Sequence, residues 1–230
     1  MKIAIITAME KESLPLCQRL GQVVGDELNA GVHTRIFVYR NNYIYLVTCG
    51  IGEILAASAT QYIIDRYKID YIVNFGYVGS LSKEYNAGDL LIVDKVVHHQ
   101  YDLSGLDNVS RGQYEGRSSV FFELTQSTRD NINHFLTNPL RVVTVASGDE
   151  FIARRESKEF LNSNYGAGVC DMELAGIVIT ALRNGIHVAS IKIVSDCADE
   201  NAANDYYALV KQGFSSAESL FTNILEKLYA

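Results

Sequence analysis

The chain has 230 residues, of which 48% are hydrophobic and 20% are charged, a balance typical of a globular protein with a full-sized core. A formal net charge of −7 argues against nucleic acid as a partner, because phosphate backbones are bound by clustered Lys and Arg. Few prolines, no low-complexity segment and no internal repeat favour a single domain over residues 1–230.

The sequence also indicates where the protein works. No apolar run is long enough to span a bilayer, and the strand expected from Lys2 onward leaves no room for a signal peptide. The cysteines show no Cys-x-x-Cys spacing, as is typical of a reducing compartment; they are Cys17, Cys49, Cys170 and Cys197. We therefore expect a cytoplasmic protein without a membrane partner, which binds a small molecule or a second copy of itself.

Apolar residues alternate along the chain between runs typical of strands and spacings typical of helices. Strands are expected at residues 2–7, 34–39, 43–48, 70–75, 89–97, 141–146 and 187–194, with a short apolar strand before Cys170. Helices are expected at residues 8–20, 53–67, 121–136, 156–162 and 205–228, and from Leu174 onward. Residues 103–119 form the longest expected loop. The interleaving, with a hairpin at Asn41 and Asn42, predicts an α/β fold with a mixed sheet.

Clusters of small and acidic residues follow three of the apolar strands, at residues 147–152, 170–173 and 195–199. Glycines follow another strand at Gly50 and Gly52, where a ligand could approach backbone N–H groups at a helix start. These two glycines are only part of a dinucleotide-binding fingerprint, because Leu55 occupies the place of the third glycine. Carboxylates gathered at strand ends indicate a ligand crevice in an open α/β sheet.

Certain carboxylates stand out by their position: Glu12, Asp149, Glu173 and Asp196. Paired carboxylates suit glycosidic chemistry, in which one group protonates the leaving group and the other stabilises the sugar cation or activates water. Acidic residues at helix starts also have a simpler explanation, the helix dipole, and Glu12 taken alone fits that explanation. Neither a Gly-x-Ser-x-Gly motif nor a P-loop occurs, and adjacent His98 and His99 point to opposite faces. We therefore expect no acyl-transfer chemistry, no metal site and no cofactor.

Motifs along the whole chain resemble those of a known family. They are Met9-Glu10-Lys11-Glu12, Gly50-Ile51-Gly52, Ser147-Gly148-Asp149-Glu150-Phe151-Ile152, Asp171-Met172-Glu173 and Ser195-Asp196-Cys197-Ala198-Asp199. In this order they look like the 5′-methylthioadenosine/S-adenosylhomocysteine nucleosidases of the nucleoside phosphorylase superfamily. The resemblance implies a three-layer αβα sandwich around a mixed sheet and a homodimer. It also implies hydrolysis of the N-glycosidic bond of a thioether adenosine, which releases adenine and a thioribose.

The resemblance assigns catalytic roles to three residues. Asp196 would protonate adenine N7, and Glu12 would position and deprotonate the attacking water. Glu173 would remain ionised, hold the ribose hydroxyls and stabilise positive charge on the sugar. An ordinary Asp has a pKa of about 3.9, so Asp196 would need burial or a like-charged neighbour to stay protonated.

The resemblance also implies contacts with the substrate. Phe151 would stack on adenine, the backbone of Ile152 would read its Watson–Crick edge, and Met172 would pack under the ribose, although Phe151 and Met172 taken singly could be core. Leu103 and Leu106 would line the 5′-alkylthio pocket across the dimer. Other residues at substrate-contact positions of the family are Ala8, Ile51, Val78, Gly79, Lys192, Ser195 and, closing over the tail, Tyr206.

Three residues depart from the family pattern. Tyr77 stands where a small hydroxyl residue is usual, and it could crowd the water or ribose end of the site. Lys192 replaces an arginine and keeps the charge without the bidentate fork, and Asp171 is one methylene shorter than the usual Glu.

Two alternatives stay open. A purine nucleoside phosphorylase would need cationic groups for phosphate, but the glycine loops carry no arginine and Glu12 would repel the anion. A non-catalytic nucleoside-binding protein on the same scaffold is motivated by Tyr77 and Lys192.

Overall fold

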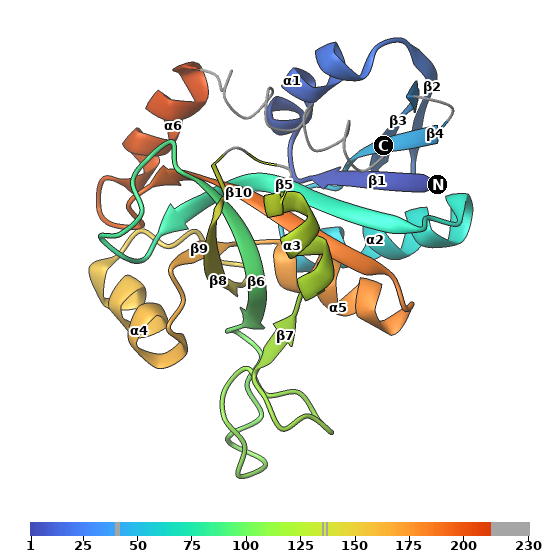
Figure 1. Cartoon of the computed structure of the whole chain (residues 1–230). Helices are drawn as coiled ribbons and strands as arrows, with labels where there is room; N and C mark the ends of the chain where they lie inside the picture. Colours follow the sequence, from blue (N-terminus) through green and yellow to red (C-terminus); the bar gives the residue numbers. More distant parts are fainter. Residues whose placement is uncertain (40–41, 135, 137, 213–230) are drawn as a thin grey trace.

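The computed structural model describes residues 1–39, 42–134, 136 and 138–212 (Figure 1). The strands are β1 (Lys2–Thr7), β2 (Val23–Asn29), β3 (Val32–Tyr39), β4 (Asn42–Thr48), β5 (Tyr71–Ser80), β6 (Leu90–His98), β7 (Phe121–Glu123), β8 (Arg141–Ser147), β9 (Val169–Asp171) and β10 (His187–Asp196). The helices are α1 (Glu10–Leu20), α2 (Glu53–Tyr67), α3 (Gln126–His134), α4 (Arg155–Tyr165), α5 (Leu174–Arg183) and α6 (Ala202–Gln212). Within the described ranges, no helix combines the length and the apolar character needed to cross a bilayer.

Strand β5 lies at the centre of a mixed sheet. One edge of β5 pairs in parallel with β10, and the other pairs with β1 near its start and with β9 at its end. From β1 the sheet continues through β4 and β3 to β2. On the other side, β10 pairs with β6, β6 with β8 and β8 with β9, so β5, β10, β6, β8 and β9 form a closed ring of hydrogen-bonded strands. The open sheet expected from the sequence is therefore closed at the end where the acidic clusters lie.

Helices cover both faces of this sheet (Figure 1). Apolar residues of α1 and α3 join one buried cluster, and those of α2 and α5 join another. Alternate residues of β1 serve both clusters, since Ile3 and Ile5 belong to the first and Ala4 and Ile6 to the second. This two-sided burial explains why the sequence of β1 is apolar without interruption. The predicted three-layer αβα sandwich with a mixed central sheet is confirmed.

The helix predicted from Leu174 onward is confirmed as α5. The apolar residues on its inner face are fully buried: Leu174, Ala175, Ile177, Val178 and Ala181. Leu182, which shares the helical spacing that predicted the helix, is 43% exposed. Burying one large aliphatic side chain such as Ile177 contributes roughly 1.5–3 kcal/mol. This face packs on α2 and on the sheet, and it fixes the start of α5 at the acidic cluster that ends with Glu173.

The prediction of one helix over residues 121–136 is wrong. Residues 121–123 form β7, which pairs antiparallel with β6, and α3 begins at Gln126. The apolar residues Phe121 and Phe122 are typical of a strand, and pairing with β6 overrides the helical spacing. Strand β2 was not predicted because it is a polar edge strand with few buried residues.

Two strands extend further than predicted, and this difference matters for the site. Strand β5 continues to Ser80 and so includes Val78 and Gly79, while β10 continues to Asp196. The final helix, predicted over residues 205–228, begins at Ala202; residues 213–228 of that prediction lie outside the described residues.

Candidate active site

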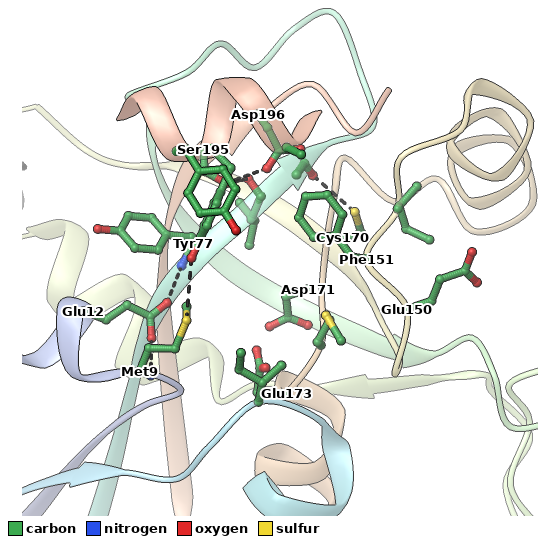
Figure 2. Close-up of a pocket in the computed structure, with 18 residues that line it drawn as sticks. Met9, Glu12, Tyr77, Glu150, Phe151, Cys170, Asp171, Glu173, Ser195 and Asp196 are labelled. Atoms are coloured by element: carbon green, nitrogen blue, oxygen red, sulfur yellow. Dashed lines mark hydrogen bonds between the residues drawn. The ribbon is translucent and has the colours of Figure 1, made fainter. Parts of the chain in front are cut away.

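A cavity of about 280 Å³ lies between α1, the ends of β5, β9 and β10, the loop after β8, and α6 (Figure 2). Its lining includes most of the residues predicted from the sequence: Glu12, Ile51, Val78, Gly79, Phe151, Ile152, Met172, Glu173, Ser195, Asp196 and Tyr206. The structure therefore brings the predicted acids and the predicted apolar contacts to one place, although they come from distant parts of the chain.

Asp196 ends β10 and is almost completely buried, at 2% exposure. Its Oδ1 accepts a hydrogen bond from the backbone N–H of Ala198 at 2.8 Å. In the sheet register Asp196 lies beside Gly79, where an added Cβ would be 3.0 Å from Asp196 Oδ1. A larger residue at position 79 would displace the carboxyl group. Burial raises the pKa of Asp196, which is the shift that the predicted role requires.

The contacts of Ser195 fit an acid form of Asp196. Ser195 Oγ lies 2.7 Å from Asp196 Oδ2 and 3.2 Å from the carbonyl oxygen of Val78. A hydroxyl has one proton and can donate to only one of these oxygens. If Asp196 carries a proton on Oδ2, it donates to Ser195, and Ser195 donates to Val78. Both contacts are then satisfied hydrogen bonds.

Glu12 lies in the first turn of α1 and is 3% exposed. Its Oε2 accepts hydrogen bonds from the backbone N–H groups of Ala8 at 2.8 Å and Met9 at 3.0 Å. Its Oε1 accepts one from the N–H of Tyr77 at 3.2 Å (Figure 2). Burial nevertheless raises the pKa of Glu12. Ala8 does not line the cavity, but its N–H group holds the acid that does.

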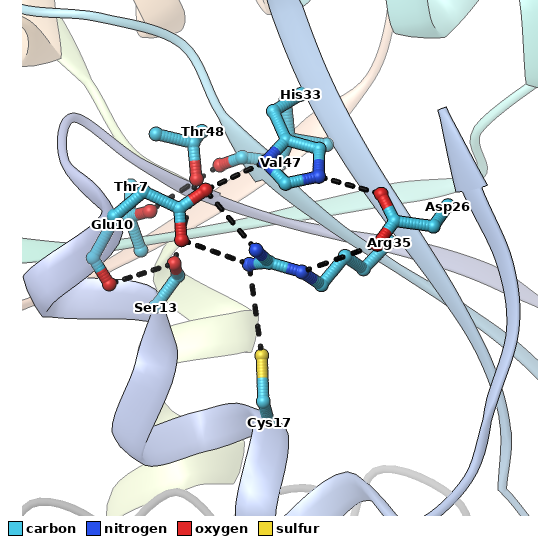
Figure 3. Close-up of polar contacts among 9 residues, drawn as sticks. All are labelled: Thr7, Glu10, Ser13, Cys17, Asp26, His33, Arg35, Val47 and Thr48. Atoms are coloured by element: carbon cyan, nitrogen blue, oxygen red, sulfur yellow. Dashed lines mark hydrogen bonds and ion pairs between the residues drawn. The ribbon is translucent and has the colours of Figure 1, made fainter. Parts of the chain in front are cut away.

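Glu10, two residues earlier, joins α1 to the β2–β3 hairpin (Figure 3). Arg35 donates to its two carboxylate oxygens at 3.0 and 3.2 Å, and His33 Nδ1 lies 2.6 Å from Oε1. The other ring nitrogen of His33 lies 2.6 Å from Asp26. Partly exposed ion pairs of this kind contribute little to stability. We therefore interpret them as surface contacts between α1 and the hairpin, whereas Glu12 is held by backbone N–H groups.

Glu173 immediately precedes α5, and its Oε1 accepts a hydrogen bond from the N–H of Gly52 at 3.1 Å. Burial and the Asp171 carboxylate raise the pKa of Glu173 to about 8, although Lys192 opposes this effect. This direction opposes the carboxylate form that the resemblance implies for Glu173, and its ionised state during the reaction stays a prediction. Gly50 and Gly52 both have positive φ, which an L-residue rarely adopts. An added Cβ would meet the side chain of Leu55 at Gly50 and that of Asp149 at Gly52, and the approach of a ligand to this turn stays a prediction.

Aromatic rings border the cavity. The ring of Tyr206 meets that of Phe151 at 6.3 Å and that of Tyr77 at 5.8 Å, both edge to face. The Tyr206 hydroxyl donates to Met9 Sδ at 3.6 Å. Phe151 is 45% exposed, which leaves a face available to a planar ligand. The ring of Tyr77 also packs against the buried cluster that includes apolar residues of α1. That Tyr77 crowds the water or ribose end of the site stays a prediction.

Three further predicted contact residues do not line this cavity. Lys192 is 1% exposed within β10, and its Nζ lies 2.6 Å from Asp171 Oδ2. Leu103 and Leu106 lie in the loop after β6, and Leu106 is 80% exposed. A single chain therefore does not bring these leucines to its own cavity, as expected if they act across a dimer. Among the described residues, no group of three or more His, Cys, Asp or Glu side chains could hold a metal ion.

A family model described as the phosphorylase superfamily matches residues 2–230. The chain belongs to this superfamily. An aminodeoxyfutalosine nucleosidase of Helicobacter pylori is 28% identical over 236 residues, with 99% of each chain covered. A 5′-methylthioadenosine/S-adenosylhomocysteine nucleosidase of Buchnera aphidicola is 28% identical over 213 residues, covering 90% of this chain and 89% of that protein. The resemblance stated from the sequence is thereby confirmed.

Solved structures also support membership of this chain in the superfamily. A Helicobacter pylori 5′-methylthioadenosine/S-adenosyl homocysteine nucleosidase matches with a TM-score of 0.93 and 26% identity, covering 99% of this chain and 98% of that chain. That protein was crystallised with a ligand that joins an aminopyrrolopyrimidine to a pyrrolidinol bearing a propynylthiomethyl group. The predicted class of enzyme, which acts on N-glycosidic bonds, agrees with the names of these relatives.

Several residues of the superfamily member's site were not predicted to act there. Met9, Cys170, Ala203 and Tyr207 line the cavity, and Glu150 lies at its side. Met9 and Tyr207 could have been expected at the site, because they are close in sequence to the predicted residues Glu12 and Tyr206. Buried Glu53 and Ser147 lie behind the cavity, where Ser147 contacts Asp171 and Glu53 accepts the N–H of Gly176; the sequence offered no signal for this arrangement, because it joins α2, β8 and α5.

Proposed function

We propose that the chain hydrolyses the N-glycosidic bond of 5′-methylthioadenosine and S-adenosylhomocysteine, releasing adenine. The observation that carries the proposal is the lining of one cavity by Glu12, Glu173 and Asp196, each buried enough to have a raised pKa. Water supplies the new bond to the sugar C1′ carbon, and the electron pair of the broken C–N bond goes to the purine.

Asp196 is the proposed acid for departure of adenine. Its raised pKa supports an acid form that can protonate N7, so that the purine leaves neutral. Phe151 and Ile152 line the same cavity as Asp196, which supports stacking on the base and recognition of its edge.

Glu12 is the proposed base for the attacking water. Three backbone N–H groups fix its orientation, and such preorganisation lowers the cost of placing water at the sugar. Glu173 is proposed to hold the ribose hydroxyls, with Met172 beneath the ring. The oxocarbenium-like sugar carries the positive charge that would favour the carboxylate form of Glu173 during the reaction.

The two alternatives make different demands on the cavity. A phosphorylase needs cations for phosphate, but none of the described residues that line the cavity is lysine or arginine, and the nearby Lys192 is paired with Asp171. A purely binding protein has no need for three buried acids around one cavity. Both observations favour hydrolysis.

The proposal predicts adenine release from 5′-methylthioadenosine in phosphate-free buffer, with no increase when phosphate is added. Adenine is measured by chromatography, with inosine as the control substrate that should not react. A strict requirement for phosphate would turn the assignment to a phosphorylase. Tight nucleoside binding without any base release would turn it to a binding protein.

A second substrate is motivated by the aminodeoxyfutalosine nucleosidases of Helicobacter pylori, which match over 99% of this chain. We include aminodeoxyfutalosine in the same assay. The ratio of kcat/KM between this compound and 5′-methylthioadenosine decides which of the two is the preferred substrate.

We further propose a homodimer located in the cytoplasm, in which the partner's loop completes the 5′ pocket. Exposed apolar residues support an interface: Ile51 at the cavity, Ile54 and Leu55 in the first turn of α2, and Leu106 in the loop after β6. We expect light scattering to give twice the mass of one chain, and Leu106→Ser to raise KM for 5′-methylthioadenosine. Leu28→Ser is the control, because Leu28 is 76% exposed on β2 and does not line the cavity. A monomeric mass at assay concentration, with full activity, would rule the dimer out.

A further inference from the structure

Ser147 lies between two buried carboxyl groups behind the active-site cavity. Its Oγ is 2.5 Å from Glu53 Oε1 and 2.5 Å from Asp171 Oδ1. It also accepts a hydrogen bond from the backbone N–H of Ala175 at 3.1 Å. A hydroxyl carries one proton, so it can donate to only one of the two carboxyl groups. The other short contact would set two lone pairs against each other unless that carboxyl group carries a proton itself.

The neighbours of each carboxyl group show which one holds the proton. Asp171 Oδ2 lies 2.6 Å from Lys192 Nζ, so the ionised form of Asp171 has a buried cation as its partner. Within the part of the chain that the structure describes, no cation is paired with Glu53. Its Oε2 accepts a short hydrogen bond from the backbone N–H of Gly176, and its Oε1 faces Ser147. Because ionised groups are buried only when they are paired, the proton belongs on Glu53.

We propose that Glu53 is kept as a neutral carboxylic acid and positions the start of α5, which carries Glu173 at the cavity. Glu53 Oε1–H donates to Ser147, Ser147 donates to Asp171, and Asp171 is paired with Lys192. The remaining oxygen of Glu53 receives the Gly176 N–H in the first turn of α5. In this chain of contacts each proton is donated once, the two lone pairs of Ser147 Oγ accept from Glu53 and from the N–H of Ala175, and α2, β8, β9, β10 and α5 are joined behind the site.

The packing around Glu53 supports this role. An added Cβ at Gly176 would lie 2.5 Å from the Glu53 carbonyl oxygen, so α5 approaches α2 as closely as a glycine allows. On the other side, the N–H of Glu53 donates to Asp149 Oδ1 at 2.7 Å, and the N–H of Gly52 donates to Glu173. A shift of Glu53 would therefore be transmitted directly to the turn that holds Glu173.

The charged and titratable groups around Glu53 favour its neutral form. They are Asp171 on β9, Asp149 after β8, and Tyr114 in the loop before β7, with Lys192 of β10 beyond Asp171. Burial, and then the Asp171 carboxylate, raise the pKa of Glu53 to about 7. Tyr114 adds no charge near neutrality, because burial raises the pKa of its phenol.

The sign of the pH dependence follows from linkage. The unperturbed pKa of Glu53 is 4.5, so between pH 4.5 and about 7 the folded chain holds a proton that the unfolded chain has released. The stability contributed by this group is complete below pH 4.5 and is lost as the pH rises through about 7. Replacement of Glu53 by the neutral, isosteric glutamine should preserve the contacts and remove this dependence.

The test compares wild type with Glu53→Gln and Glu53→Ala, and uses Glu84→Gln as the matched control because Glu84 is exposed in the connection between β5 and β6 and takes no part in the network. The infrared difference between wild type and Glu53→Gln at pH 6 should contain the carbonyl stretch of a carboxylic acid, and this band should disappear at pH 9. The midpoint of thermal unfolding should fall between pH 5 and 9 more steeply in wild type and in Glu84→Gln than in Glu53→Gln. Absence of the acid band, or equal slopes in all three proteins, would overturn the proposal.

Positioning is tested separately and rests on the proposed nucleosidase activity. Glu53→Ala should lower kcat for adenine release roughly 10- to 100-fold by misplacing Glu173, while Glu53→Gln should stay close to wild type. Equal losses in both variants would mean that the ionised form is the one required. If no substrate is hydrolysed by wild type, the activity proposal fails, and the infrared and unfolding results still decide the state of Glu53.

Discussion

Asparagine in place of Asp196 is expected to lower the rate of adenine release at least roughly a thousandfold, because the purine must then leave without a proton at N7. The change is well suited to the site. Asparagine keeps an oxygen for the N–H of Ala198, and its amide can donate to Ser195, which then donates to Val78 as inferred for the acid form. The buried surroundings of Asp196 are therefore preserved while the transferable proton is removed. The measurement is kcat under saturating 5′-methylthioadenosine.

Two controls separate loss of chemistry from loss of structure. Asp130→Asn makes the same chemical change on the exposed face of α3 and should leave kcat unaltered. Calorimetry with adenine should show that Asp196→Asn still binds the base. Adenine release at the wild-type rate in Asp196→Asn would show that another group protonates the purine.

Glutamine in place of Glu12 is expected to lower kcat roughly a hundredfold or more, the usual contribution of a positioned general base. The carboxylate uses both oxygens as acceptors, two N–H groups at Oε2 and one at Oε1. Glutamine has only one acceptor oxygen, so its amide group must face at least one backbone N–H of Ala8, Met9 or Tyr77. The variant therefore loses the base and also the fixed orientation of the side chain.

The position of Glu12 predicts which parameter changes. Adenine is proposed to bind near Asp196 and Phe151, whereas Glu12 comes from α1 at another wall of the cavity. Glu12→Gln should therefore bind adenine as wild type does and should fail in turnover. Glu10→Gln is the comparison on the same helical turn, and it should affect the contact with Arg35 and leave most activity in place. A large loss of adenine affinity in Glu12→Gln would argue for a role in base binding.

Local patterns predicted much of this molecule. The apolar run of residues 2–7 and the helical spacing from Leu174 correspond to β1 and α5, because burial on one or both faces leaves a periodic trace in the sequence. The acidic clusters that follow strands also predicted the cavity. The predictions also failed for local reasons. Pairing with β6 makes residues 121–123 a strand, and the polar strand β2 shows no apolar alternation in its sequence.

The support behind the acids could not be predicted in this way. Lys192 lies between Ile191 and Ile193 in β10, which suggests a buried partner without identifying it. Its partner Asp171 is on β9, and Glu53, which shares Ser147 with Asp171, opens α2. Glu53 and Ser147 are more than 90 positions apart in the sequence, and only the folded sheet brings them together. Residue type alone also could not show that burial would raise the pKa of Glu173 to about 8.

The closed ring of strands has a consequence for how this protein is made. Strand β10 follows every other strand of the described chain, yet it lies between β5 and β6. While a ribosome is still producing the chain, the edge of β5 and the start of β6 that β10 joins have no partner until β10 has emerged. Unpaired edges of this kind attract other extended chains, so the nascent protein is exposed to aggregation until β10 pairs with them. Strand β10 also carries Asp196. Pairing of β10 with its neighbours therefore covers the open strand edges and places the proposed proton donor in the same step.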